Sequence, residues 1–490
     1  MRLTAQDFHR RYAPSKCDRR VFLQNRGIDE APPSEFDQVI MRLGQRYEAQ
    51  YLATVPKVIN LRSLDRDKRF EQTQALVKAD SDAIYQPLLK TQIPIEGQDC
   101  EIVGEPDFLI REDGSYIIRD VKMARRVEEE SHPEILLQLQ FYGWLYERVF
   151  GSPPARLEVL NGKGELVPVP AANQAVLDEF RKLIGLKQLA EEPYEPVGWT
   201  KCGSCGFRGH CWPKAESEQD VSLVYDIDQG LARELHGQGV SSIRGLLERF
   251  DAAKLSEFKR PWGTRLQKVG KKAGMILARA KVMTRKKEVV IAEPDIPKFD
   301  HYVMFDLEGM PPHLDEIDKI YLWGMQVFGK TQGEFMPAVA GFGDNGDREG
   351  WFDFLAKAET ILRQYGDIPF VHWHHYERTH IDAYVQRYGD PAGIAARVHA
   401  NLLDLLPIAR ESVLLPLSSY SLKEVEKYVN FKRSQTEFGG SWSMAKFIEA
   451  TETNDEAQRN KLINDILTYN REDLAATWAV FEWLRIKTIG

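Results

Sequence analysis

Residues 104–126 read GEPDFLIREDGSYIIRDVKMARR, and this stretch decides the fold expected for the first part of the chain. It holds two runs of apolar and β-branched residues around a Glu-Asp-Gly turn, which predicts a β-hairpin. Because side chains alternate between the faces of a strand, Asp120 and Lys122 project from the same face, and Asp107 can face them from the preceding strand. Two carboxylates can hold Mg²⁺ or Mn²⁺ through hard oxygen ligands, and a nearby lysine can orient the attacking water or offset charge on a phosphate.

Two flanking segments add candidate residues to this hairpin. The segment RLGQRYEAQYL, residues 42–52, carries Glu48, and LLQLQFYGWLY, residues 136–146, places Gln138 and Tyr142 on one face of a helix. In this order, the four elements resemble the motifs of RecB-like PD-(D/E)XK nucleases. The resemblance implies a restriction-endonuclease-like α/β domain. It puts Glu48 on the metal side of the site, where many relatives carry histidine, and makes Gln138 and Tyr142 the Q-x-x-x-Y signature.

The cysteines suggest a second type of site. Three of the five, Cys202, Cys205 and Cys211, crowd together, and Cys17 lies far upstream. This pattern is typical of a metal or cluster site rather than a disulfide framework. Four thiolates suit Zn²⁺ or an iron-sulfur cluster, and the spacing alone does not choose between them. The arrangement is similar to that of iron-sulfur RecB-like nucleases, which implies a [4Fe-4S] cluster joining both ends of the domain. The alternative is zinc, with His210 as a substitute ligand.

The last part of the chain begins with an acidic motif in an apolar strand, YVMFDLEGM, residues 302–310. Asp306 and Glu308 share one face of this strand. Burying two like charges in a core strand is costly without a cation, so the motif predicts a metal site. Near the C-terminus, the strongly helical ILTYNREDLAATWAVFEWL stacks Tyr469 above Asp473. Both motifs resemble the DEDDy class of RNase H-like 3′–5′ exonucleases, in which acids hold two metal ions and the tyrosine positions the attacking water.

The middle motif departs from that family pattern. VHWHHYERTHI matches the usual N-G-x-x-F-D only if His372 replaces the asparagine, Tyr376 the phenylalanine and Glu377 the aspartate. A glutamate can ligate Mg²⁺, but its extra methylene shifts the carboxylate, so either the geometry has adapted or activity is reduced. Asp404, in NLLDLLPIAR, is an alternative candidate for the middle acid.

A basic segment separates the two sets of motifs. Residues 254–287 contain twelve Lys or Arg residues against one acid, Glu257, in a chain of formal net charge -8. If residues 265–280 are helical, five basic residues share one face. They are Arg265, Lys268, Lys271, Lys272 and Arg279. Most charge runs are solvated helix faces. Because the charges here are almost all positive, contact with a phosphate backbone is an equally good interpretation. The preceding glycines resemble those of a helix-hairpin-helix.

Length and composition indicate the number of domains and the class of protein. A chain of 490 residues suggests roughly three domains. Its 43% hydrophobic and 28% charged residues are typical of a globular protein, and no apolar run is long enough to cross a bilayer. The N-terminus lacks the apolar region of a secretory signal, so we expect a cytoplasmic, reduced protein.

We therefore expect a multidomain α/β protein: a RecB-like PD-(D/E)XK domain with a cysteine cluster in residues 1–215, a helical basic connector in residues 216–292 and an RNase H-like domain in residues 293–490. The combination resembles a group of bacterial and archaeal RecB-like nucleases with a C-terminal RNase H-like domain. It implies a metal-dependent deoxyribonuclease that acts at single-stranded DNA ends, with RNA as a possible further substrate, in repair, recombination or defence, beside a helicase or defence-system partner. Two alternatives stay open: a nucleic-acid-binding scaffold with one or both heads inactive, and an accessory nuclease of CRISPR adaptation or defence.

Overall fold

The computed structural model describes residues 1–263, 265–311, 318–341, 343–435 and 439–489, which fall into two compact units. The first comprises Met1–Glu195 and Thr200–Cys211, and the second Pro196–Trp199 and Trp212–Gly490. The segment expected to form a separate connector, residues 216–292, thus lies in the second unit. Among the described residues, no helix combines the length and apolar character needed to cross a membrane.

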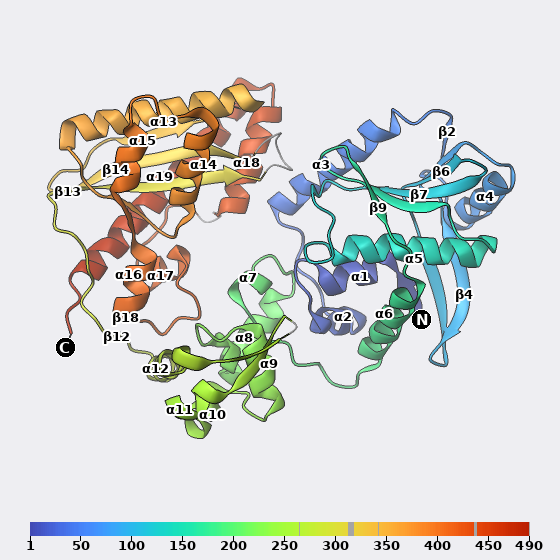
Figure 1. The fold of residues 1–490 in the computed structure, drawn as a ribbon, viewed down its shortest axis with the longest axis horizontal. Helices are drawn as coiled ribbons and strands as arrows, with labels where there is room; N and C mark the ends of the chain where they lie inside the picture. The colour runs from blue at the N-terminus through green and yellow to red at the C-terminus, as the bar shows by residue number, and fades with distance from the viewer. Residues whose placement is uncertain (264, 312–317, 342, 436–438, 490) are drawn as a thin grey trace. The chain divides into compact units, whose positions relative to one another are not determined.

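The first unit contains two sheets surrounded by helices (Figure 1). The six-stranded sheet has the order β2 (Val58–Asn60), β3 (Ala83–Tyr85), β6 (Phe108–Glu112), β7 (Ser115–Val121), β8 (Arg156–Leu160) and β9 (Leu166–Val169). The three-stranded sheet has the order β1 (Arg2–Thr4), β5 (Gln98–Gly104) and β4 (Leu89–Ile95). The helices are α1 (Ala5–Tyr12), α2 (Asp18–Asn25), α3 (Glu35–Leu52), α4 (Arg66–Lys78), α5 (Pro133–Phe150) and α6 (Asn173–Gln188), followed at the boundary by α7 (Trp199–Cys202) and α8 (Arg208–Glu218).

The predicted hairpin is confirmed as β6 and β7. The strands pair antiparallel up to Glu112 and Ser115, which leaves a two-residue turn. Asp113 and Gly114 occupy it with φ of 49° and 82°, the left-handed conformation that an Asp-Gly turn supplies. The turn therefore fixes the register of the two strands.

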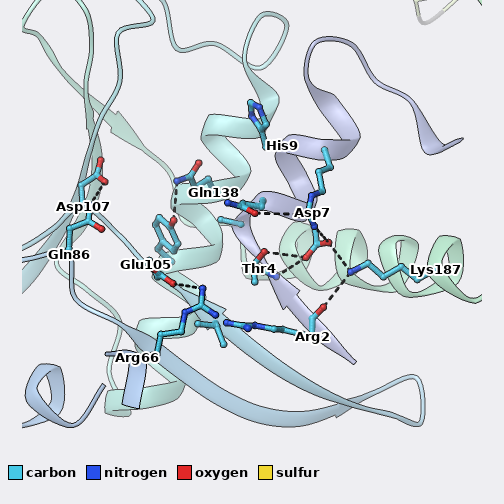
Figure 2. Close-up of a pocket in the computed structure, with 15 residues that line it drawn as sticks. Arg2, Thr4, Asp7, His9, Arg66, Gln86, Glu105, Asp107, Gln138 and Lys187 are labelled. Atoms are coloured by element: carbon cyan, nitrogen blue, oxygen red, sulfur yellow. Dashed lines mark hydrogen bonds and ion pairs between the residues drawn. The ribbon is translucent and has the colours of Figure 1, made fainter. Parts of the chain in front are cut away.

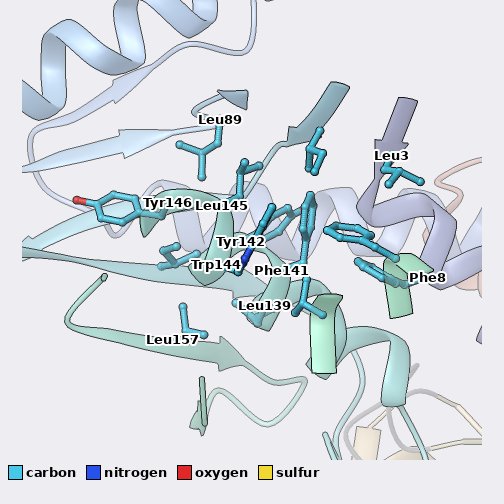
Figure 3. Packing of buried hydrophobic residues seen from close by; sticks show 14 of the residues in the cluster. Leu3, Phe8, Leu89, Leu139, Phe141, Tyr142, Trp144, Leu145, Tyr146 and Leu157 are labelled. Atoms are coloured by element: carbon cyan, nitrogen blue, oxygen red, sulfur yellow. The ribbon is translucent and has the colours of Figure 1, made fainter. Parts of the chain in front are cut away.

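Helix α5 packs against strands of both sheets, which explains why it is apolar around most of its circumference. Figure 3 shows its aromatic and aliphatic side chains, Phe141 and Leu145 among them, within the core. On β7, Tyr116 and Ile118 point into the same core. By the alternation of a strand, Asp120 continues that row and faces α5.

The second unit is built on a five-stranded mixed sheet. Its order is β15 (Phe335–Val339), β14 (Lys319–Gly329), β13 (His301–Met310), β16 (Phe370–His372) and β17 (Leu402–Asp404), with the first three strands antiparallel and the last two parallel to β13. The helices that follow its first three strands are α13 (Gly343–Tyr365), α14 (Tyr376–Tyr388), α15 (Ile394–Ala400), α16 (Leu405–Ser412), α17 (Leu422–Tyr428), α18 (Gly440–Glu452) and α19 (Glu456–Arg485). The strand expected over residues 302–310 and the expected terminal helix are thus confirmed as β13 and α19.

Two helices cover opposite faces of this sheet, α13 on one side and α19 on the other (Figure 1). Val303 and Phe305 of β13 pack in the core with α13. The alternating residues Tyr302 and Met304 pack in the core with α19. Asp306 and Glu308 continue the second row, so β13 directs both acids toward α19.

The prediction of one helix over residues 265–280 is wrong. The segment forms a hairpin of β10 (Lys259–Trp262) and β11 (Arg265–Lys268), a short turn, and then α12 (Ala273–Arg285). Gly270, with φ of 62°, lies between strand and helix in a conformation that a helix interior does not allow. The remaining elements of this region are α9 (Gln229–Gly237), α10 (Ile243–Arg249), α11 (Ala252–Glu257) and the short strand β12 (Val289–Val290), which pairs with β18 (Val413–Leu414).

Candidate active sites

In the first unit, two carboxylates at the hairpin, those of Asp107 and Asp120, accept hydrogen bonds from backbone amides across the strand pair. Asp120 Oδ1 accepts a hydrogen bond of 3.0 Å from the Asp107 amide, and Asp107 Oδ2 accepts one of 2.8 Å from the Val121 amide. Asp120 is fully buried. The two side chains are therefore oriented by the strand pairing itself.

The predicted lysine and glutamine both bind the second oxygen of Asp120. Lys122 Nζ donates to Asp120 Oδ2 at 3.0 Å and lies 3.9 Å from Asp107 Oδ2. Gln138 Nε2 donates to the same Asp120 oxygen at 2.9 Å and to the Tyr142 hydroxyl at 3.0 Å. The structure thus brings the hairpin residues and the Q-x-x-x-Y pair of α5 together.

Glu48 of α3 reaches this group through two residues that the sequence did not single out. Glu48 Oε1 accepts hydrogen bonds from the Tyr85 hydroxyl at 2.6 Å and from Gln86 Nε2 at 2.9 Å. Gln86 Nε2 also donates to Asp107 Oδ1 at 3.1 Å, so it bridges the two acids. Gln86 has φ of 54°, a conformation rare for a non-glycine residue. No local sequence signal marks it, apart from its place after a short strand.

The electrostatics of the first site show an excess of buried negative charge. Burial, followed by the neighbouring Asp120 carboxylate, raises the pKa of Asp107 to about 8. Burial opposes the charge of Lys122, but Asp120 and Asp107 outweigh it and raise the pKa of the lysine above its usual range. A divalent cation on these carboxylates would relieve the repulsion between them.

A cavity of about 600 Å³ opens beside this group. Asp107 and Gln138 line one part of it, and Arg2 and Lys187 line another (Figure 2). Lys187 pairs with Asp7 at 2.8 Å. The cavity is therefore lined by both acidic and basic side chains.

In the second unit, three carboxylates converge from β13 and α19. Ligand oxygens of Asp306, Glu308 and Asp473 lie within 4.8 Å of one another, the single such group among the described parts of the chain. Burial and Asp473 raise the pKa of Glu308 to about 8, and the same two causes raise that of Asp306 well above its usual range. The clustered oxygens are the hard ligands that Mg²⁺ or Mn²⁺ prefers.

Arg433 partly offsets this charge. It binds Glu426 through two hydrogen bonds of 2.7 and 2.6 Å and also donates to Asp473. Its guanidinium lies 5.6 Å from the centre of the Tyr469 ring. Neither Arg433 nor Glu426 was predicted, because both act through tertiary contacts that no spacing in the sequence reveals.

A further unpredicted residue, Asn470, orients the first acid. Its Nδ2 donates to Asp306 Oδ2 at 2.8 Å. Asn470 is fully buried and follows Tyr469 directly on α19. Its position inside the predicted Tyr-x-x-x-Asp motif was the available signal.

Glu377 of the middle motif is not among the three carboxylates whose oxygens lie within 4.8 Å of one another. Its charge nevertheless adds, after burial, Asp473 and Glu308, to the raised pKa of Asp306. Glu377 is buried in the first turn of α14, with Oε2 at 3.0 Å from His372 Nδ1. Asp404 caps α16 by accepting from the Leu406 amide at 3.0 Å, and it accepts from the His374 amide at 2.9 Å. The substituted glutamate thus pairs with the histidine that stands in the asparagine position.

The four cysteines predicted to bind one group all lie in the first unit as free thiols. Cys17 precedes α2, and Cys205 and Cys211 pack on the small apolar cluster of Phe22 and Phe207. Burial raises the pKa of Cys211, and Cys17 and Cys205 add to this increase. The thiols from the two ends of the unit are therefore close enough to repel one another as thiolates.

Five basic residues were expected to share one exposed helical face, and the structure corrects this expectation for Arg279, which is buried. It is 3% exposed, pairs with Asp226, and lies 4.7 Å from the centre of the Tyr225 ring and 5.6 Å from that of Tyr420. A guanidinium enclosed in this way is not available to a phosphate. The other four do not share a helix, since Arg265 and Lys268 lie on β11 and Lys271 and Lys272 in the following turn.

Two family models match the chain. Residues 4–212 match the PD-(D/E)XK nuclease superfamily, and residues 303–485 match the RNase_H superfamily. No curated protein matches the chain. A solved structure titled "Crystal structure of SSO0001" is 17% identical over 36% of this chain and 97% of that chain, with a TM-score of 0.21 that carries no conclusion on fold.

The two matched ranges each contain one of the carboxylate sites described above. Both superfamilies contain nucleases, which supports a phosphodiester hydrolase. The chain therefore joins a PD-(D/E)XK nuclease domain at its N-terminus to an RNase H superfamily domain at its C-terminus.

Proposed function

We propose that this protein is a metal-dependent deoxyribonuclease that removes nucleotides from single-stranded DNA ends, with one active site in each unit. The observation that carries the proposal is the convergence of Asp306, Glu308 and Asp473, whose oxygens lie within 4.8 Å of one another. Mutual repulsion of these buried acids is relieved by a divalent cation, and a cation held there would stabilise charge on a phosphate.

In the first site, Glu48, Asp107 and Asp120 would hold Mg²⁺ or Mn²⁺. Lys122 is anchored to Asp120 and can orient a water molecule or contact the phosphate. Gln138 and Tyr142 keep the Asp120 carboxylate in place, since Gln138 donates to both of these residues. These roles would make it a site of the RecB-like type.

In the second site, Asp306, Glu308 and Asp473 would hold the metal, as in DEDDy exonucleases. Tyr469 lies one helical turn before Asp473 and can position the attacking water. Glu377 of α14, positioned by its contact with His372, would be the fourth acid of this site. This arrangement suits exonucleolytic hydrolysis.

We further propose that Cys17, Cys202, Cys205 and Cys211 hold a [4Fe-4S] cluster. A cluster on four thiolates is anionic, and the surrounding residues fit it. Arg20 is buried, and its Nε and Nη1 have no hydrogen-bond partner in the described structure. Burial raises the pKa of Cys17, and the positive charge of Lys201 opposes this increase, as it would stabilise an anionic cluster. The cluster would supply a structural link between the two ends of the unit; zinc is the alternative.

A second candidate function is a nucleic-acid-binding scaffold in which the second site is inactive. Two contacts favour it: Arg433 already pairs with Asp473, and Glu377 pairs with His372 instead of joining the other acids. In a third context, an accessory nuclease of repair or defence, the same chemistry would serve a helicase or defence-system partner.

The test is digestion of end-labelled single-stranded and duplex DNA and RNA by the 490-residue chain with Mg²⁺ or Mn²⁺. We expect Asp120→Asn and Asp473→Asn each to remove part of the activity, and the double variant to remove nearly all. Asp113→Asn, in the exposed turn of the first hairpin, and Glu456→Gln, exposed on α19, are matched controls.

Two results would decide against parts of the proposal. A double variant that digests as fast as the parent would show that both sites are misassigned. Binding without digestion in either metal would favour the scaffold. For the cysteines, a brown protein whose colour disappears in Cys202→Ala supports iron, whereas stoichiometric zinc in a colourless, active protein excludes the cluster.

A further inference from the structure

The hairpin of β10 and β11 exposes large apolar side chains in a strongly basic setting. Trp262 is 60% and Leu266 is 70% exposed, and all four residues of β11 are exposed. A tryptophan at the surface of a protein is often part of a binding site, because its large apolar area favours burial. Trp262 belongs to none of the motifs recognised in the sequence.

The structure holds the Trp262 ring in a defined position. Arg260 lies two residues before it on β10, and the Arg260 guanidinium is 4.5 Å from the centre of the indole ring. Arg260 is itself anchored by an ion pair of 2.8 Å with Asp228 at the start of α9, and its side chain is only 12% exposed. One face of the indole is therefore covered by a fixed cation while most of the side chain stays exposed.

Helix α9 also fixes the hairpin as a whole. A β-carbon on Gly230 would lie 2.9 Å from the Pro261 carbonyl oxygen, so glycine permits the close approach of helix and strand. Trp262 is opposite Arg265 in the register, which places an exposed cation on the same side of the hairpin as the indole. The pair is thus presented on an anchored element.

The charges near the indole within residues 254–287 are almost all positive. The one acid among residues 254–287, Glu257, pairs with Lys268. Lys259, Arg265, Lys271 and Lys272 form no ion pair with any residue that the structure describes. This charge pattern complements a phosphate backbone rather than an apolar or basic protein surface.

We propose that this hairpin is a docking site for single-stranded nucleic acid, in which Trp262 stacks on a base and Arg265 and its basic neighbours contact phosphates. An aromatic ring flanked by cations is the chemistry that binds single strands without reading their sequence. The inference rests on the proposed function in taking nucleic acid as the substrate, but the hairpin lies outside both carboxylate sites.

The experiment measures binding of fluorescein-labelled oligothymidylate and oligouridylate to the 490-residue chain by anisotropy. EDTA withholds the divalent metal, so binding is measured without digestion. We expect Trp262→Ala to weaken binding by about tenfold and Trp262→Phe to retain most of it, because phenylalanine still stacks. We expect Arg265→Ala to lower the slope of log affinity against log salt by about 0.7, the value for one phosphate contact on a single strand.

Matched controls come from the same unit. Ile486→Ala removes an apolar side chain that is 70% exposed, and Lys330→Ala removes an exposed lysine outside the basic segment. Both should bind as the parent does. Unchanged affinity in Trp262→Ala would overturn the proposal, as would loss of self-association in that variant with intact binding of both oligonucleotides. If binding depends on Trp262 but the parent digests nothing, the docking site stands and the nuclease assignment fails.

Discussion

The side chain of Asn470 occupies the space where a β-carbon on Gly324 would lie. An ideal β-carbon at Gly324 would be 1.7 Å from Asn470 Oδ1, far inside contact distance. Gly324 lies on β14 directly opposite Asp306, and Asn470 donates to the Asp306 carboxylate at 2.8 Å. The glycine is therefore what allows α19 to deliver a hydrogen bond to the first acid of the second site.

Gly324→Ala is expected to reduce hydrolysis at the second site by at least about tenfold, because displacing Asn470 removes one oriented hydrogen bond from Asp306. The measurement is Mg²⁺-dependent digestion in an Asp120→Asn background. Gly274→Ala on α12 is the control, since a β-carbon there meets nothing within 4 Å. Full activity in Gly324→Ala with a folded protein would show that Asn470 does not position Asp306.

The metal-free protein is expected to lose stability as the pH rises from about 4 to about 8. The pKa values of Asp107 and Glu308 are raised from 3.8 and 4.5 to about 8, so the folded state retains protons that the unfolded state releases. Their contribution is fully present below the unfolded pKa and is lost through the folded pKa. Unfolding in urea with EDTA between pH 5 and 8.5 measures it.

The same experiment has an internal check. Asp107→Asn should gain stability relative to the parent at pH 8 but not at pH 5, whereas the exposed Asp113→Asn should follow the parent at both. Mg²⁺ should stabilise the parent more at pH 8, because protons no longer compete for the carboxylates. A parent-like pH profile in Asp107→Asn would contradict the role assigned to this acid.

The sequence predicted those parts of the sites that follow from periodicity within one element. The strand period of two placed Asp120 with Lys122 and Asp306 with Glu308, and the helical spacing of four placed Tyr469 above Asp473. Contacts between elements were not predictable in this way. Gln86 and Arg433 reach their acids only after the chain has folded, because neither lies in a motif with the residue that it binds.

The prediction for the basic segment failed for a different reason. The spacing of Lys268, Lys271 and Lys272 fits a helical face, but a charge pattern does not specify the backbone. Gly270 adopts a left-handed conformation within the range, and the strand before it has no alternation of apolar and polar residues that would have marked it. Trp262 lies among these basic residues in the sequence, but a pattern of charges does not mark an aromatic residue.

Loss of the cysteine-bound group is expected to destabilise the first unit while sparing hydrolysis at the second site. Cys17 and the other three cysteines come from opposite ends of that unit in the sequence, so the proposed group would link distant segments and its binding energy would add to folding. Cys202→Ala should lower the unfolding temperature by several degrees, and activity in an Asp120→Asn background should persist. Cys100→Ala, at a buried thiol outside the cluster, is the control. An unchanged unfolding temperature in Cys202→Ala would contradict a structural role.

The variant Arg279→Ala distinguishes a structural role of this buried residue from a role in binding phosphate. Removing one partner of a buried ion pair leaves the other uncompensated, so Arg279→Ala should cost about 3 kcal/mol of unfolding free energy, the low end for such pairs because Asp226 is partly exposed. Its loss should leave the salt dependence of DNA binding unchanged. Lys281→Ala, exposed on the same helix, should barely alter stability. If Arg279→Ala instead lowers the salt slope by nearly one contact and unfolds like the parent, then the guanidinium leaves Tyr225 and Tyr420 to reach a phosphate.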